Sequence, residues 1–89
     1  MVTSIILLNI KRDKVNDVAE QLAGMPGVSE VYSVTGKYDL VAIVRVKTND
    51  ELAELVTNRF VRTDGIGKTD TMLAFKAYSR HDLEAMFSM

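Results

Sequence analysis

The stretch VYSVTGKYDLVAIVRV, Val31 to Val46, holds a turn between two runs that read as β-strands. Leu40 to Val46 is almost continuously apolar, which is typical of a strand covered on both faces. Gly36 permits the positive φ that a tight turn requires. Residues 28–34 alternate, and although Val31 breaks the pattern, we expect three side chains on one face: Val28, Tyr32 and Val34.

The segment before this hairpin predicts a strand and a helix. Val2 to Ile10 is a second apolar strand. Asp13 is placed to cap the helix that follows, and Gly24 with Pro26 ends it. Apolar residues recur in this helix at i, i+3, i+4 and i+7 and predict one buried stripe: Val15, Val18, Ala19 and Leu22.

The segment after the hairpin repeats this order. Thr48 and Glu51 have capping-box spacing at the start of a second helix, and a last strand is expected from about Lys68 to Tyr78. Ser79 and Asp82 have the same spacing and predict a short C-terminal helix. The apolar residues of the two helices are Leu52, Leu55, Val56 and Phe60, and then Leu83, Met86 and Phe87.

The resulting order, β-α-β-β-α-β, predicts a ferredoxin-like α+β fold with one antiparallel sheet and both main helices on one face. A faint internal repeat relates Asp13 to Glu20 with Asp50 to Thr57 and supports two β-α-β halves. The second face of the sheet has no helix to cover it. Because a bare apolar face is larger than a monomer tolerates, we expect a face-to-face dimer.

Composition narrows the class of function. A chain of 89 residues suits one domain, and eleven basic against twelve acidic residues argue against direct binding of nucleic acid. The absence of cysteine excludes disulfides and thiolate chemistry. The apolar N-terminus lacks a basic region and is too short to cross a membrane, so we expect a cytoplasmic protein with no membrane partner.

Catalytic motifs are scarce. His81 has no second histidine or cysteine for a usual zinc site, and no serine stands in a nucleophile-elbow motif. The glycines of DGIG, Asp64 to Gly67, lack the Lys-Ser/Thr ending of a phosphate loop. We therefore expect no enzyme, no catalytic residue, no metal and no cofactor.

Two polar clusters are candidate ligand-binding residues. The amides of Gly36 to Tyr38 could converge on an anion, and Asp39, at the start of a strand, needs a partner for its carboxylate. Amide donors beside a carboxylate are suited to bind a zwitterionic ligand. The alternative interpretation is an ordinary turn in which Asp39 is hydrogen-bonded to local backbone. Thr69 and Thr71 point to one face of the last strand, although threonine is also simply a good strand former.

With these motifs, the chain resembles the RAM (regulation of amino-acid metabolism) domain, the effector-binding domain of Lrp/AsnC transcription regulators. The likeness covers the whole chain, and its specific parts are TGKYD, Thr35 to Asp39, and GIGKTDT, Gly65 to Thr71. It implies ligand contacts from five residues: Gly36, Tyr38, Asp39, Thr69 and Thr71.

The resemblance also implies partners. Such protomers pair through their sheets into a dimeric α/β barrel, commonly assemble into octamers (tetramers of dimers), and bind free amino acids or similar small effectors between protomers. Residues 1–89 would form a single RAM domain without a helix-turn-helix domain. Regulation of transcription or metabolism would then require ligand-dependent assembly or co-assembly with a DNA-binding relative.

Two other functions share this topology. One is a small dimeric α/β-barrel enzyme of the antibiotic-biosynthesis monooxygenase type, although the predicted interior is almost wholly apolar. The other is an assembly module without a ligand.

Overall fold

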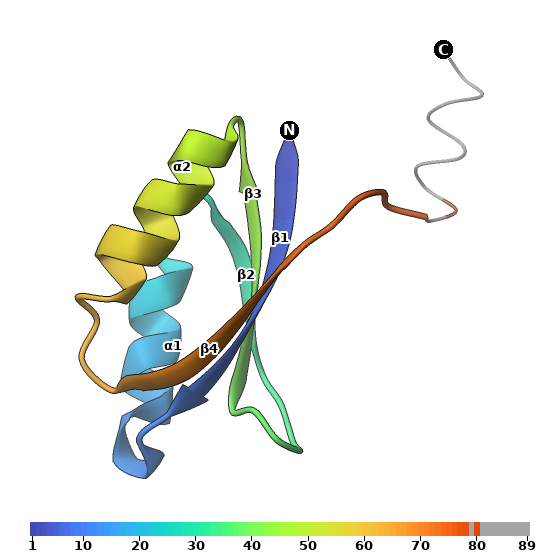
Figure 1. Cartoon of the computed structure of the whole chain (residues 1–89). Helices are drawn as coiled ribbons and strands as arrows, with labels where there is room; N and C mark the ends of the chain where they lie inside the picture. Colours follow the sequence, from blue (N-terminus) through green and yellow to red (C-terminus); the bar gives the residue numbers. More distant parts are fainter. Residues whose placement is uncertain (79, 81–89) are drawn as a thin grey trace.

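A four-stranded antiparallel sheet with both helices on one face forms the fold (Figure 1). The computed structural model describes residues 1–78 and residue 80, so the expected C-terminal helix and His81 lie outside the described residues. The elements in order are β1 (Val2–Ile10), a 3-10 helix η1 (Arg12–Lys14), α1 (Val15–Ala23), β2 (Val28–Ser33), β3 (Leu40–Val46), α2 (Asn49–Glu54), a π-helix η2 (Leu55–Phe60) and β4 (Ile66–Leu73).

The sheet order is β2-β3-β1-β4, so β1 is a central strand, and β2 and β4 form the two edges. Pairing is antiparallel throughout. The ferredoxin-like α+β fold predicted from the element order is therefore confirmed.

The helix-covered face of the sheet carries the core. Alternate residues of β1 and β3 point into it, and the helices contribute Val18, Leu22, Leu55 and Phe60. Both predicted helical stripes are confirmed, because their remaining members pack against the same cluster. The buried residues of the two strands are Ser4, Ile6, Leu8, Ile10, Leu40, Ala42, Val44 and Val46.

The opposite face, which we call the open face, has no helix over it in the described residues (Figure 1). Ile5 pairs with Ile43 and Leu7 pairs with Val41, so these four apolar side chains lie side by side, half-buried. The expectation that the central strands are covered on both faces is therefore wrong within one protomer.

A bulge in β2 changes which side chains reach the open face. Val28 pairs with Val44, but Glu30 pairs with Ile43, so two residues of β2 advance while β3 advances one. The prediction that Val28 and Tyr32 share a face is wrong, because the bulge turns Tyr32 to the open face.

Of the other local predictions, one is confirmed and two differ from the structure. Thr48 accepts a hydrogen bond from the Glu51 amide at 3.1 Å, which confirms the capping box. The prediction that Asp13 caps the helix is wrong, because Asp13 lies within η1 and the N-cap residue of α1 is Lys14, which makes no side-chain capping bond. The last strand is shorter than expected and ends at Leu73. Among the described residues, no helix is long and apolar enough to cross a membrane.

Candidate functional site

The loop between β2 and β3 is closed by a hydrogen bond from the Val34 amide to the Asp39 carbonyl oxygen at 3.0 Å. Gly36, in this loop, has a φ of 106°, as the turn prediction required. A Cβ atom there would meet nothing within 4 Å, so the glycine serves the backbone conformation and not close packing. The loop therefore lies open around Gly36.

Asp39 joins this loop to the central strand. Its amide donates to the Leu8 carbonyl oxygen at 2.9 Å, and its Oδ2 accepts from the Ile10 amide at 2.7 Å. The pairing of β3 with β1 ends at Leu40 and Leu8, so Asp39 extends the sheet beyond its last regular pair. The carboxylate therefore has a backbone partner 29 residues away, not a neighbour in the turn.

Tyr38 lies across the end of the sheet. Its hydroxyl donates to the carboxylate of Asp70 in β4, and this hydrogen bond is the main cause that raises the pKa of Tyr38 above 10.0. Asp70 pairs with Leu7, whose side chain is on the open face. Asp70 was not among the candidate ligand-binding residues predicted from the sequence. Its position between Thr69 and Thr71 nevertheless indicated that its side chain lies on the opposite face of the strand from theirs.

Thr69 and Thr71 share a face of β4 with Leu73, as expected. Thr69 pairs with Leu8 and Thr71 with Ile6, which puts both on the helix-covered side. Both remain exposed, because β4 is an edge strand. Thr69 also lines a cleft of about 240 Å³ between η2 and β4, whose other residues are Val56, Phe60, Val61, Ile66 and Gly67.

Four of the candidate residues lie at one end of the sheet, whereas Thr71, opposite Ile6, lies at the middle of β1, and the five do not form one pocket. Asp39 and Thr69 flank Leu8 from opposite sides of β1. Tyr38 contacts the open face, and the threonines lie on the helix-covered face. A ligand touching both sets would need a surface that the single protomer lacks.

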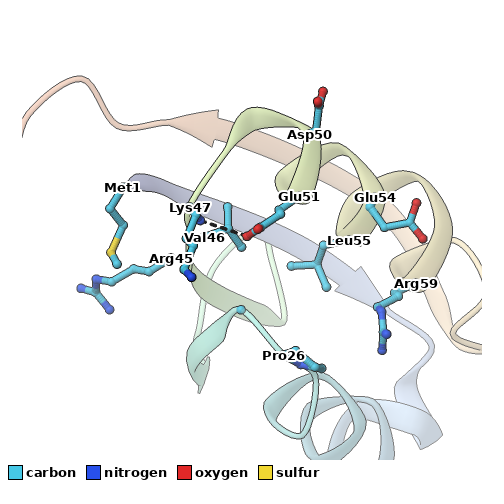
Figure 2. A pocket seen from close by; sticks show the side chains of 11 residues that line it. Met1, Pro26, Arg45, Val46, Lys47, Asp50, Glu51, Glu54, Leu55 and Arg59 are labelled. Carbon is cyan, nitrogen blue, oxygen red and sulfur yellow. Dashed lines mark hydrogen bonds between the residues drawn. The ribbon is translucent and has the colours of Figure 1, made fainter.

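A larger cleft of about 650 Å³ lies at the other end of the sheet and includes none of these five residues (Figure 2). It is bounded by the end of β3, the start of β2 and the side of α2 and η2. Glu51 lies beside it and accepts a hydrogen bond from the Lys47 amide at 3.0 Å, whereas Asp50 points away (Figure 2). Sequence reasoning did not single out this cleft.

Metal-binding groups are not assembled in the described part of the chain: no three His, Cys, Asp or Glu residues there are placed to hold an ion. The two buried polar side chains, Ser4 and Thr63, each donate to a backbone carbonyl oxygen.

A family model described as the Lrp/AsnC ligand binding domain matches residues 3–83. The HTH-type transcriptional regulator FL11 of Pyrococcus horikoshii is 36% identical over 73 residues, which are 82% of this chain and 48% of that protein. An uncharacterized HTH-type regulator of the same organism, PH1916, is 41% identical over 59 residues, 66% of this chain and 39% of that protein. The chain spans half or less of the length of these relatives.

Solved structures agree with this likeness. TTHA0845 of Thermus thermophilus is 45% identical and superposes with a TM-score of 0.84 over 90% of this chain and 100% of that one. The feast or famine regulatory protein of M. tuberculosis, complexed with L-methionine, has a TM-score of 0.72 over 90% of this chain and 54% of its own. At 21% identity, this second likeness is one of fold alone.

Proposed function

This chain belongs to the Lrp/AsnC ligand binding domain family, and from that membership we propose that it is a non-enzymatic module that binds a free amino acid in an oligomer. The observation that carries the proposal is the position of Asp39. Its carboxylate is anchored through Oδ2 beside the open loop at Gly36, so a negative charge and an exposed turn lie together. A zwitterionic amino acid offers the two complementary charges.

Each candidate residue is assigned the part of the ligand that its chemistry suits. Asp39 receives the ligand ammonium group, and the amides around Gly36 and Tyr38 receive its carboxylate. The hydroxyls of Thr69 and Thr71 contact the polar part of the ligand. The apolar cleft beside Thr69 has space for a small side chain. The L-methionine bound by the M. tuberculosis relative is a ligand of this kind.

A neighbouring protomer completes the site, because the two sets of residues lie on different faces here. The open face supports a face-to-face dimer: Ile5, Ile43 and Met72 form one apolar row across it, and Leu7 with Val41 forms the next. Burying such rows is the main driving force for protein association. Dimers then assemble further, with an octamer as the expected end state.

Ligand and assembly are coupled in this scheme. A ligand held between protomers binds only the assembled form and therefore stabilises it by mass action. Since curated relatives are HTH-type transcriptional regulators, the output is regulation of transcription or amino-acid metabolism, through co-assembly with a DNA-binding relative or through the ligand-dependent assembly itself.

The interior favours binding over catalysis. Within the part of the chain that the structure describes, eleven buried apolar residues fill the space between sheet and helices, and the buried polar residues Ser4 and Thr63 are both hydrogen-bonded to backbone. An enzyme of the same topology needs polar groups pointing into that space.

The test is a thermal-shift screen of the common amino acids, followed by calorimetry on any that raise the melting temperature. Asp39→Asn keeps an oxygen to accept the Ile10 amide but removes the charge, so binding should weaken by about tenfold or more. Asp50→Asn, an exposed acid at the other end of the sheet, is the matched control. Equal affinity in wild type and Asp39→Asn would remove the ammonium role from Asp39.

A further inference from the structure

The segment after β4, residues 74–78, leaves the body of the protein as an extended arm (Figure 1). Its last bond to the sheet runs from the Ala74 amide to the Thr3 carbonyl oxygen at 2.9 Å. Beyond it, Phe75 is 101% exposed and Tyr78 is 80% exposed. Two aromatic side chains without a cover in the described protomer mark the arm as a contact segment.

The large cleft has the apolar floor that such a side chain needs. Val46 and Leu55 are buried at its base, and Pro26 with Gly27 forms one side (Figure 2). Gly27 has a φ of 94°, and a Cβ atom on it would come within 2.7 Å of Val46 Cγ1. The cleft, at about 650 Å³, is large enough for an aromatic ring and the backbone that carries it.

The arm and the cleft lie at the same end of the sheet, since β4 and β3 run parallel and both finish there. They lie at opposite edges, because the cleft borders the start of β2 and the arm continues β4. When two such sheets close face to face about a two-fold axis parallel to the strands, each β4 edge comes beside the partner's β2 edge with like ends together.

We propose that the arm of one protomer docks on this cleft of its dimer partner, with Phe75 seated against Val46 and Leu55 of the partner subunit. The proposal rests on the face-to-face dimer proposed above and assigns it a second, reciprocal contact outside the open face. By symmetry, each dimer has two such contacts.

Charge supports this occupant. The wall of the cleft formed by α2 presents Glu51 and Glu54, and the arm places Lys76 next to Phe75. The rim also carries three cations, Arg45, Lys47 and Arg59, of which Arg45 is paired, with its Nη1 3.7 Å from Glu30 Oε1. Lys76 would meet the partner's acidic wall while the aromatic ring enters the floor.

The absence of cysteine permits a disulfide test in the full chain. A tagged Phe75→Cys chain is mixed under mild oxidation with an untagged chain carrying Glu54→Cys or Arg59→Cys, both at the cleft rim. The expected product is a mixed-mass disulfide dimer, formed faster than with Lys37→Cys, an equally exposed control at the far end of the sheet. Equal rates for rim and control positions would overturn the docking.

Sedimentation of Phe75→Ala separates this proposal from the dimer itself. A fully exposed side chain adds nothing to protomer stability, so the fold should be unchanged and dimer dissociation about tenfold or more easier. An unchanged dimerisation constant overturns the arm contact and leaves the face-to-face dimer standing. A wild type that sediments as a monomer at micromolar concentration overturns both.

Discussion

The two faces of the sheet are made from alternate residues of the same strands, yet only one is covered. Ile6, Leu8, Leu40 and Val44 on the helix side are 0% exposed. Their neighbours on the open face have the same apolar character and remain half-exposed. The comparison separates two tasks: one face of β1 and β3 holds the protomer together, and the other is available for a second protomer.

The largest effect should come from Leu8→Ala, on the covered face. Deleting a fully buried leucine side chain removes about 2–5 kcal/mol from the free energy of unfolding. Leu7→Ala is the matched change on the open face, and it should cost less at low protein concentration. Urea unfolding followed by circular dichroism measures both. Equal costs for the two at all concentrations would contradict the division between faces.

The next effect concerns assembly and not folding. Ile43→Asp puts a charge at the centre of the open face, where dimer formation would bury it without a partner. We expect a folded monomer and dimer dissociation easier by roughly 100-fold, measured by sedimentation. Ala53→Asp is the control, because Ala53 is exposed on α2 and lies outside the open face. Unaltered dimerisation of Ile43→Asp would show that this face stays unpaired.

A smaller effect is expected from Ser4, the buried polar residue among the covered rows of β1 and β3. Ser4 is 0% exposed, and its Oγ donates to the Met72 carbonyl oxygen at 2.7 Å. Ser4→Ala should therefore lower the free energy of unfolding by about 0.5–1.5 kcal/mol. Thermal unfolding would reveal it, with Ser33→Ala, exposed on the same face of β2, as the control. A higher free energy of unfolding for Ser4→Ala would show that the Ser4 hydroxyl does not stabilise the fold.

The smallest effect is a change of titration on the open face. The bond to Asp70 raises the pKa of Tyr38, so its contribution to stability is complete below the ordinary tyrosine pKa of 10.0 and is lost as pH rises beyond it. Asp70→Asn should lower the pKa of Tyr38, as seen in the difference absorbance of phenolate against wild type. Superimposable titrations would show that the contact does not persist in solution.

Local pattern predicted most of the protomer. The bounds of β1 and β3 and the stripes of both helices follow from the spacing of apolar residues, and Thr48 with Glu51 follows from capping chemistry. Among the predictions that failed, the shared face of Val28 and Tyr32 was lost to a change of register. The bulge at the start of β2 depends on how that strand pairs with β3, and no spacing within residues 28–34 shows it.

In the candidate site, the backbone conformation of Gly36 was predictable from the sequence, and the contacts of Tyr38 and Asp39 were not. Gly36 was identified from turn chemistry, and its positive φ is confirmed. The bond from the Ile10 amide to Asp39 and the bond from Tyr38 to Asp70 join residues 29 and 32 positions apart. Such contacts follow from strand order and register, which a single local motif cannot supply.

The place of β1 in the sheet also sets an order of folding. The first strand of the sheet along the chain is central, and its second partner, β4, is the last strand of the sheet. The hydrogen bond from Ser4 to Met72 spans 68 residues. During synthesis, one edge of β1 therefore stays without a strand partner until β4 has left the ribosome. Because pairing β1 with β4 closes a long loop, we expect folding to be slower than that of a helical protein of the same length.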